Sequence, residues 1–253
     1  MIFDSHLHTE FSADSDMKIS DALAKAERLG IGLVTTEHLD LDFPGELDFT
    51  FSAENYWEAY APYRKKNLRL GIEIGMQHGL AERNAAFIAR VPFDEVIGSI
   101  HLVDGQDIYE PLAYDGKEQD EIYRDYFASM ASCIREHPYI DVLGHIDYIA
   151  RYAPYENPDV QYVRYREEID EVLRAVVETD TVMELNTRRL SGRLARKELA
   201  PVYARYRELG GKCVTLGSDA HSAEGIGANF AVARDFAEAK NLRIVTFCER
   251  KMI

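Results

Sequence analysis

The chain has 253 residues, of which 46% are hydrophobic, and this is enough for one large core of the size of an α/β barrel. Its formal net charge of −15 argues against a protein that grips nucleic acid, because such binding needs a surplus of lysine and arginine. No apolar run approaches the roughly 20 residues of a membrane helix, and no basic signal region precedes the first polar residues. We therefore expect a cytoplasmic protein without a membrane or nucleic acid partner.

Short apolar or β-branched runs alternate with helical patterns along the chain, which is typical of βα units around a parallel sheet. The expected strands are Met1–Asp4, Gly32–Thr36, Leu68–Ile74, Glu95–Ile100, Ile140–Leu143, Thr181–Leu185, Cys213–Leu216 and Arg243–Phe247. Among the helix patterns, Ser20–Leu29 has Ser20 as a candidate cap and Gly30 after its last turn, and Asn229–Lys240 opens on Asn229. Repeats and flexible linkers are absent from the sequence, so we expect one barrel domain over residues 1–253 with seven or eight strands.

The residues around the ends of the predicted strands are the strongest functional signal. Six separate strand ends carry a residue type that binds metal ions: His6 and His8, Glu37 and His38, Glu73, His101, His145, and Asp219 with His221. In a barrel, the carboxyl ends of parallel strands converge on one face, where the active sites of this fold are built. The pattern therefore predicts a metal site on that face.

The pair His6 and His8 adds a geometric reason. Residues two apart in an extended segment direct their side chains to the same face, so both imidazoles can bind one ion. Imidazole suits zinc, manganese or iron, while carboxylates can bridge two ions and balance their charge. The mixed set indicates more than one cation.

A single histidine is more often a surface or core residue than a ligand, but six of the eight histidines lie directly after predicted strands. The remaining two do not share this placement. His137 precedes Pro138 at the end of a helix pattern and is expected to cap that helix, and His78 is expected on the surface. The three cysteines, Cys133, Cys213 and Cys248, form no metal-binding pair and are expected as small buried residues.

Several aspartates near these strand ends permit two readings. Asp14 and Asp16 lie in a loop where they could be ligands or simple turn formers. Asp4, Asp40 and Asp147 stand beside candidate ligands, so they could orient the imidazoles or be solvated loop carboxylates.

These residues together resemble the PHP family of metallophosphoesterases, in matching order from residue 1 to about 221. The motifs that carry the resemblance are Asp4-Ser-His-Leu-His-Thr, Thr36-Glu-His, Gly71-Ile-Glu, Ser99-Ile-His, Gly144-His and Gly217-Ser-Asp-Ala-His. Three longer strings are similar to bacterial PHP-type histidinol-phosphate phosphatases: Thr36-Glu-His-Leu-Asp-Leu-Asp-Phe-Pro-Gly, Gly144-His-Ile-Asp-Tyr-Ile-Ala-Arg-Tyr-Ala-Pro-Tyr and Glu184-Leu-Asn-Thr-Arg.

The resemblance implies a distorted (βα)7 barrel with three divalent cations of zinc, manganese or iron. On that basis the first cation would be held by His6, His8, Glu73 and Asp219, and the second by Glu73, His101 and His145. The third would be held by Asp14, His38 and His221. Many family members have histidine where this chain has Asp14.

Two arginines after strand ends, Arg151 and Arg188, would bind phosphate according to the resemblance, and planar guanidinium groups suit that role. Arg189 is expected in a surface salt bridge instead. Three divalent cations bring more charge than Asp14, Glu73 and Asp219 neutralise, so the site would attract a phosphomonoester dianion despite the acidic chain.

The expected reaction is hydrolysis of a small phosphomonoester, with L-histidinol phosphate as the substrate that the resemblance implies. A hydroxide that bridges the cations would attack phosphorus, and the catalytic role is assigned to Glu73, Asp219 and His221. The proton donor for the leaving group could be Asp40, Asp147 or a water on a cation. The acidic loop from Asp40 to Glu46 could contact the ammonium and imidazole of the substrate, or it could be a solvated turn.

Two other functions remain open on the sequence. A PHP phosphoesterase could act on nucleotides, oligonucleotides or phosphotyrosine peptides, although the acidic charge disfavours polymers. A metal-binding module without catalysis would usually have lost ligands, whereas the set here is complete.

Overall fold

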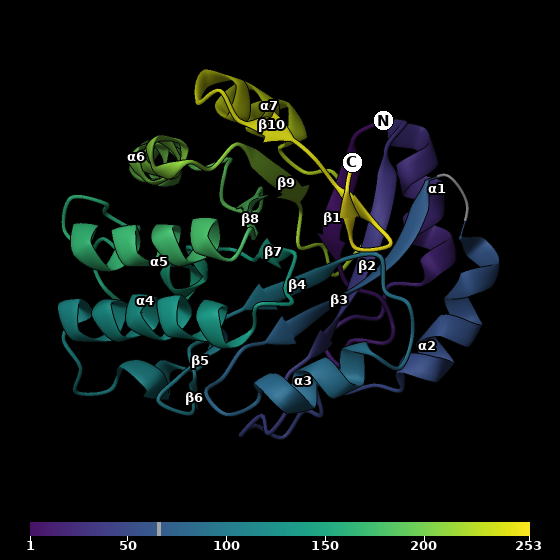
Figure 1. Ribbon diagram of the computed structural model, residues 1–253, viewed down its shortest axis with the longest axis horizontal. Coiled ribbons are helices and arrows are strands. Elements are labelled where there is room, and N and C mark those ends of the chain that lie inside the picture. The colour runs from purple at the N-terminus through teal and green to yellow at the C-terminus, as the bar shows by residue number, and fades with distance from the viewer. Residues whose placement is uncertain (65–66) are drawn as a thin grey trace.

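The computed structural model describes residues 1–64 and 67–253, and its centre is one eight-stranded sheet in which each strand pairs with its neighbours in parallel (Figure 1). Across the sheet the strands are β1 (Phe3–Leu7), β2 (Gly32–Leu39), β3 (Leu68–Gly75), β4 (Val96–Ser99), β7 (Val142–Leu143), β8 (Val182–Asn186), β9 (Cys213–Gly217) and β10 (Arg243–Ile244). Strand order in the sheet thus follows chain order, as expected for successive βα units.

The sheet curls until its first strand meets the segment that follows β9. Leu7 and Ala220 form a parallel bridge. On either side of it, the Asp219 amide donates to the His6 carbonyl oxygen at 2.7 Å and the His8 amide donates to the Ala220 carbonyl oxygen at 2.9 Å. Among the described residues, β10 pairs with the start of β9 and with no other strand. The expected distorted seven-stranded α/β barrel is therefore confirmed, with β10 as an additional edge strand.

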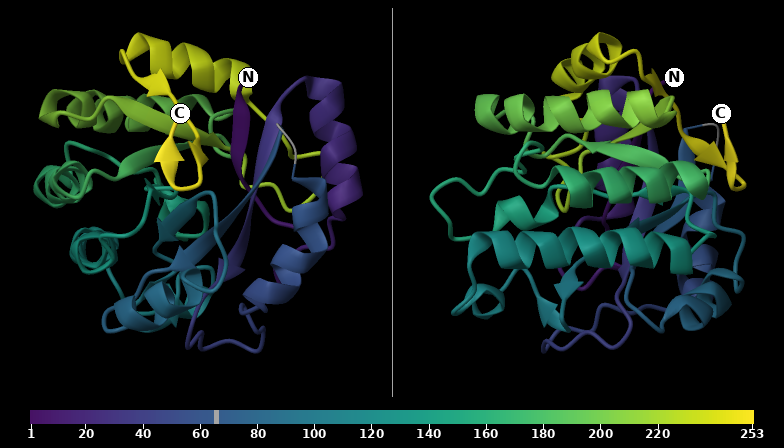
Figure 2. Two further views of the ribbon diagram at one scale, coloured as in Figure 1. Left: turned by 45° about the vertical axis from the view of Figure 1, so that its right-hand side comes forward. Right: turned by 60° about the vertical axis from the view of Figure 1, so that its left-hand side comes forward.

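Helices cover the outside of the curled sheet (Figure 2). They are α1 (Ile19–Leu29), α2 (Ala53–Tyr60), α3 (Ala81–Ile88), α4 (Gln119–Glu136), α5 (Arg166–Glu178), α6 (Arg193–Leu209) and α7 (Phe230–Ala239), with short 3-10 helices η1 (Ala61–Tyr63), η2 (Pro111–Tyr114) and η3 (Tyr148–Arg151). In α4 the buried residues recur three or four positions apart, from Ile122 to Ile134, which gives this helix one apolar face. That face packs beside α5 and against the barrel.

Several strands continue further than the sequence pattern predicts, and the difference is largest for β1 and β2. β1 ends at Leu7 rather than Asp4, so His6 lies inside the strand and not after it. β2 ends at Leu39 rather than Thr36, so His38 likewise lies inside its strand, whereas Glu73 lies inside β3 as predicted. The hydrophobic pattern ends early because these polar side chains are buried among one another instead of being solvated.

Two helix boundaries agree with the sequence prediction, whereas one predicted N-terminal cap does not. Gly30 ends α1 with a φ of 67°, and Asn229 immediately precedes α7. The expected cap by Ser20 is wrong, because α1 already begins at Ile19 and Lys18 occupies the capping position.

The predicted last strand, Arg243–Phe247, is divided in the structure. Its first part is β10, and its end begins a C-terminal antiparallel hairpin of β11 (Phe247–Cys248) and β12 (Lys251–Met252). The hairpin lies at the amino-terminal end of the barrel, where both chain termini are found (Figures 1 and 2). Arg69 donates to the Phe247 carbonyl oxygen at 2.9 Å, and the Phe247 amide donates to Glu95 at 3.3 Å.

A small apolar cluster joins this hairpin to the strands of the barrel. It consists of side chains from four neighbouring strands and the C-terminal segment: Ile97, Val142, Val182, Cys213, Val245 and Phe247. Ile97 lies two residues before Ser99, whose hydroxyl donates to Glu73, so both face the barrel interior. The apolar cluster thus lies in the barrel interior on the amino-terminal side of the polar site.

Of the three cysteines, Cys133 and Cys213 are buried as expected, whereas Cys248 in the hairpin is only half-buried. Within residues 1–64 and 67–253, no helix combines the length and apolar character needed to cross a membrane.

Candidate metal centre

The nine predicted metal ligands come together at the carboxyl-terminal ends of the barrel strands. They reach the site from β1 and the loop after it, from β2 and β3, and from the residues after β4, β7 and β9: His6, His8, Asp14, His38, Glu73, His101, His145, Asp219 and His221. Most of these side chains are fully buried, whereas Asp14 and His221, with 34% and 23% of their side chains exposed, form the open rim.

Glu73 lies at the centre of this group. Its Oε2 atom is 3.0 Å from Nδ1 of His38 and 3.3 Å from Nε2 of His6. Its Oε1 atom is 3.0 Å from Nε2 of His145 and 3.4 Å from Nε2 of His101. The two carboxylate oxygens therefore face two different sets of imidazoles, which is the arrangement that a bridging carboxylate needs.

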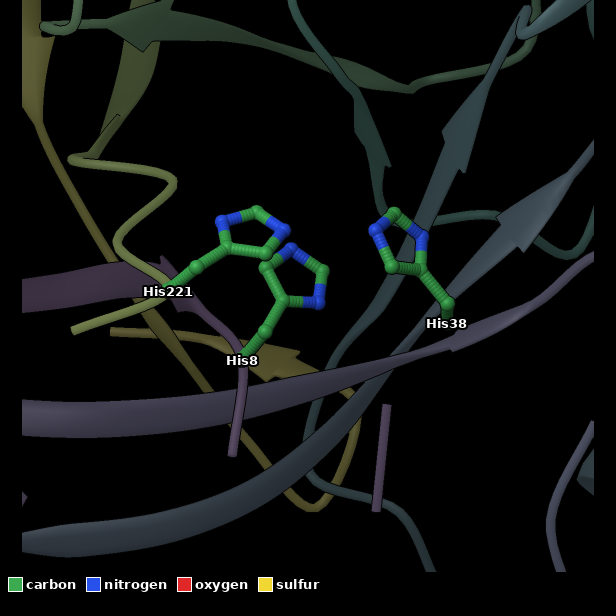
Figure 3. Close-up of side chains that lie close together, drawn as sticks. All are labelled: His8, His38 and His221. Carbon is green, nitrogen blue, oxygen red and sulfur yellow. The ribbon is translucent and has the colours of Figure 1, made fainter. Parts of the chain in front are cut away.

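Three imidazoles crowd together on the open side of the site (Figure 3). The ring of His8 stacks on the ring of His38 with centroids 4.0 Å apart and on that of His221 with centroids 4.3 Å apart. Asp14 contacts two of these rings, at 3.0 Å from Nε2 of His221 and 3.7 Å from Nε2 of His38. Such crowding of basic groups around a carboxylate suits a shared cation.

Four overlapping sets of three side chains have ligand atoms close enough to share a metal ion. They are His6, His8 and Glu73; His6, His145 and Asp219; His38, Glu73 and His101; and His8, His38 and His221. The sets agree with the expected grouping in joining His6, His8 and Glu73, and in joining His38 with His221. They differ in placing His101 with His38, where the resemblance paired His101 with His145.

The electrostatics of the site are those of a cation-binding cluster. Burial lowers the pKa of His6, but Glu73, Glu184 and Asp219 outweigh burial and raise this pKa well above its usual range. Burial alone would raise the pKa of Glu73, yet the surrounding histidines lower it far below its usual value. The pKa of His8 is lowered well below its usual range by burial and by His38 and His221. The carboxylates thus favour positive charge at the centre, whether from protons or from metal ions.

Unpaired buried atoms test whether the residues fit metal ions. Among the described residues, Oε2 of Glu73, Nδ1 of His38 and Nε2 of His101 are buried without a hydrogen-bond partner of good geometry. Leaving such atoms unpaired is costly. Since nitrogen and carboxylate oxygen donors converge here, divalent cations would satisfy these atoms, and the site fits them.

The neighbouring aspartates have three different roles. Asp40 accepts a hydrogen bond from Nδ1 of His101 at 2.7 Å, which confirms that it orients an imidazole. Asp4 instead accepts from the backbone amides of Ser218 and Gly227, at 2.8 and 2.9 Å, and so holds the loop after β9. Asp16 is exposed and does not enter the site.

The expectation for Arg189 was wrong, and so was the proposed imidazole contact of Asp147. Arg189 donates to Asp147 at 3.0 Å and also pairs with Asp159, and all three side chains are largely buried. The pair is therefore an internal contact that holds the segment after η3, rather than a surface salt bridge. Adjacent Arg188 instead lines the cavity, where 47% of its side chain is exposed.

The two predicted phosphate-binding arginines lie beside Asp219. Arg151 is buried and pairs with the Asp219 carboxylate, and it also donates to Oδ1 of Asn186 at 3.0 Å. Arg188 is freer, with 47% of its side chain exposed and its Nη1 atom 3.8 Å from Oδ2 of Asp219. Asn186 also accepts from the Arg188 amide, so one amide side chain fixes both arginines.

The two histidines left out of the site lie as expected. His78 is exposed and contacts Glu136 at 2.7 Å. His137 follows α4, and its backbone amide bonds to the Cys133 carbonyl oxygen, as a C-terminal cap does.

Glu184 and Ser99 were not predicted as site residues, yet both contact predicted ligands on the side away from the cavity. Glu184 contacts Nδ1 of His6 at 2.8 Å, and the Ser99 hydroxyl donates to Glu73 at 2.6 Å. Glu184 lies near the end of a predicted strand, so the same strand-end reasoning that selected the ligands could have identified it.

A cavity of about 780 Å³ opens above the cluster, and its floor includes Asp14, His38, His101, His145, Arg151, Arg188, Asp219 and His221. Its outer wall is formed by residues 43–49 after β2, by residues 105–113 of the segment around β6 (Gln106–Asp107) and η2, and by Tyr148 and Tyr152. β5 (Leu102–Val103) and β6 form a short antiparallel hairpin beside it. Its size suits a small molecule.

The PHP domain model matches residues 4–188 of this chain. The chain belongs to the PHP domain family. The PHP chain is also similar over its full length to a probable histidinol-phosphatase of Clostridium acetobutylicum, with 44% identity over 252 residues that cover 100% of this chain and 99% of the relative. It is 30% identical to a histidinol-phosphatase of Lactococcus lactis, over 87% of this chain and 84% of the relative.

Among solved structures, the PHP barrel of this chain is similar to histidinol phosphate phosphatase of Lactococcus lactis in complex with zinc, L-histidinol and phosphate. The TM-score is 0.92 at 28% identity, and the match covers 100% of this chain and 98% of the other. The similarity includes both ends of the chain, so the barrel and the segment after β9 that carries Asp219 and His221 have a counterpart there.

Proposed function

We propose that this PHP protein is a metal-dependent phosphatase that hydrolyses L-histidinol phosphate to L-histidinol and phosphate, a step of histidine biosynthesis, and that residues 1–253 act as one domain. The observation that carries the proposal is a cluster of nine ligand-type side chains at one end of the barrel, six of which line a small-molecule cavity together with two arginines. The relatives named above support the choice of substrate.

The cluster would hold three divalent cations of zinc, manganese or iron. His6, His8, Glu73 and Asp219 would bind the first; Glu73, His101 and His145 the second; and Asp14, His38 and His221 the third. When bound, the cations would supply a hydroxide nucleophile and withdraw charge from the phosphoryl oxygens. The catalytic residues are Asp219 and His221, which line the cavity, and Glu73, which contacts His38 and His145 at the centre of the cluster.

The arginines position and stabilise the phosphoryl group. Arg188 lines the cavity with 47% of its side chain exposed, so its guanidinium can reach phosphate oxygens, whereas Arg151 is held by Asp219 and Asn186 at a fixed orientation. As the bond from water oxygen to phosphorus forms and the bond to the alcohol oxygen breaks, negative charge grows on the departing alkoxide, which takes up a proton from a water molecule. Asp147 is paired with Arg189, and Asp40 with His101, so neither is free for this transfer.

The outer wall of the cavity suits the cationic end of the substrate. Within the acidic loop, Asp42 pairs with Arg83 away from the cavity, and Asp40 supports His101. Glu46 and Phe43 of this loop line the wall. Two further carboxylates, Asp107 and Glu110, line it as well. Carboxylates and aromatic rings on this wall would contact the ammonium and imidazole groups.

Steady-state turnover tests the proposal directly. The protein as purified should hydrolyse L-histidinol phosphate with a higher kcat/KM than a nucleotide, a phosphotyrosine peptide or an aryl phosphate. Activity should disappear after chelation and return with added metal, in proportion to the metal content measured in the same samples. Faster turnover of the nucleotide or peptide would contradict the substrate, and absence of turnover in metal-loaded protein would contradict the enzyme.

A further inference from the structure

Glu184 is a buried carboxylate that lies behind the metal site rather than in it. It belongs to none of the four potential ligand sets in the described chain, and only 1% of its surface is exposed. Its Oε1 atom is 2.8 Å from Nδ1 of His6. Its Oε2 atom accepts from the His145 backbone amide at 2.7 Å and from the Asn186 side chain at 3.3 Å. One side chain on β8 thus contacts segments that carry two predicted ligands.

The contact with His6 is made at the ring nitrogen that faces away from the cluster. The other nitrogen, Nε2, points inward, at 3.1 Å from Nε2 of His8 and 3.3 Å from Oε2 of Glu73. Because a carboxylate oxygen accepts a hydrogen bond, Glu184 places the ring proton on Nδ1 and leaves the lone pair of Nε2 directed at the cation position. Glu184 therefore selects the tautomer of His6 that can bind metal.

The neighbouring strand leaves room for this contact. A Cβ atom at Gly217 of β9 would lie 2.0 Å from Oε1 of Glu184 and 2.5 Å from Cβ of His6. No ordinary side chain fits there, so glycine is needed at this position for steric reasons.

The same arrangement occurs at a second imidazole of the site. Asp40 contacts Nδ1 of His101 at 2.7 Å, and a Cβ atom at Gly75 would lie 2.0 Å from Oδ1 of Asp40. One ligand in β1 and one ligand after β4 are thus each supported by a carboxylate, and a glycine on an adjacent strand makes room for each carboxylate. Repetition of the arrangement indicates that it serves the ligands.

We propose that Glu184 is a positioning residue for the metal site: it fixes the tautomer and orientation of His6 and at the same time fixes the backbone of His145, with Gly217 providing the space. This inference rests on the metal-dependent function proposed above. Removal of a carboxylate in such a position typically lowers metal affinity or activity by about 10- to 100-fold.

The substitution Glu184→Gln tests the role with little change of shape. An amide offers one acceptor atom, so it cannot accept from both His6 Nδ1 and the His145 amide. We expect zinc affinity, measured by competition with a chromophoric chelator, to fall about 10- to 100-fold. The visible spectrum of the cobalt-substituted protein should change as the ligand geometry relaxes, and Glu184→Asp should recover part of the affinity.

The matched control is Glu95→Gln, which makes the same change at a fully buried carboxylate at the opposite end of the barrel. This variant should bind zinc as the unchanged protein does. Unchanged zinc affinity and cobalt spectrum in Glu184→Gln would overturn the proposal, even if activity or thermal stability fell. These measurements need no turnover, so they remain informative if the proposed substrate is wrong.

Nitrogen NMR of the unchanged, zinc-loaded protein gives a second test that does not depend on a variant that folds. The His6 ring should carry its proton on Nδ1 and bind zinc through Nε2. A proton on Nε2, or coordination through Nδ1, would overturn the proposal.

Discussion

Adjacent residues of the same type have opposite environments in this site. Arg189 is 3.0 Å from Asp147 and only 19% of its side chain is exposed, whereas Arg188 has 47% of its side chain exposed on the cavity floor. A guanidinium that already has buried carboxylate partners cannot leave them cheaply to bind a substrate. Only Arg188 of this pair is therefore available to phosphate.

Replacing Arg188 by alanine should weaken phosphate binding. A hydrogen bond to a charged group contributes about 1.5–3 kcal/mol, so Arg188→Ala should raise KM for phosphate esters by roughly 10- to 100-fold with the metal content unchanged. Steady-state kinetics and elemental analysis of the same preparation measure both quantities. Arg90→Ala is a suitable control, since Arg90 is exposed to a similar extent, 48%, and does not line the cavity. Kinetics equal to those of the control would remove Arg188 from the site.

Each strand has distinct functions at its two ends. β3 carries Arg69 near its start and Glu73 near its end, and β4 is preceded by Glu95 and followed by His101. At the carboxyl-terminal ends of the strands, carboxylates such as Glu73 contact imidazoles. At the amino-terminal end, the Glu95 carboxylate accepts a hydrogen bond from the Phe247 amide of the hairpin, and its Oε1 atom has no hydrogen-bond partner among the described residues. The amino-terminal end of the barrel therefore contains a carboxyl group that forms no ion pair with a described basic side chain.

The pKa of Glu95 gives a stability prediction for this end of the barrel. Burial, with Asp141 adding repulsion, raises the Glu95 pKa well above its usual value of 4.5. The folded state thus favours the protonated form, so the contribution of Glu95 to stability is complete below the unfolded pKa and is lost as pH rises toward the folded pKa. The neutral variant Glu95→Gln should avoid this loss and be more stable at pH 7, by about 1–3 kcal/mol.

Thermal unfolding of chelated protein between pH 4.5 and 7 measures this effect. The difference in Tm between Glu95→Gln and the unchanged protein should be small at the acidic end and should grow with pH. A difference independent of pH, or a less stable variant at pH 7, would contradict the assigned protonation.

At the scale of the whole molecule, the metal cluster joins strands that are distant in the sequence. Its ligands span residues 6 to 221, and they lie on both sides of the contact between β1 and the segment after β9, where the sheet closes. Without cations, the concentrated imidazoles and carboxylates remain incompletely paired. Metal binding should therefore stabilise the entire barrel and not only the site.

Removing metal should lower both activity and the unfolding temperature. A ligand that binds only the folded state contributes about 2.7 kcal/mol at a concentration 100 times its Kd, which corresponds to a rise in Tm of roughly 5–10 °C for a chain of this size. Calorimetry of chelated and zinc-reloaded protein measures the difference. Equal Tm values for samples that differ in measured zinc content would contradict a role of these residues in metal binding.

The amino-acid sequence determined the ligand types, their order and the barrel that carries them. Apolar runs alternating with helical patterns define βα units, and the ends of parallel strands must converge, so the face that collects His6, Glu73, His145 and Asp219 follows from the pattern. Family motifs then gave the substrate class. The ends of β1 and β2 were placed too early because the buried ligands His6 and His38 are polar and interrupt the hydrophobic signal.

Only the tertiary structure decided which group supports which ligand. Glu184 and His6 are 178 positions apart, and their contact depends on the curl of the sheet and on the space at Gly217. The same holds for Asp40, which contacts His101, and for Asp147, which contacts Arg189 although it follows a ligand in the same way. Hydrogen bonds act over about 3 Å, and no local pattern fixes distances between residues of separate strands to that precision.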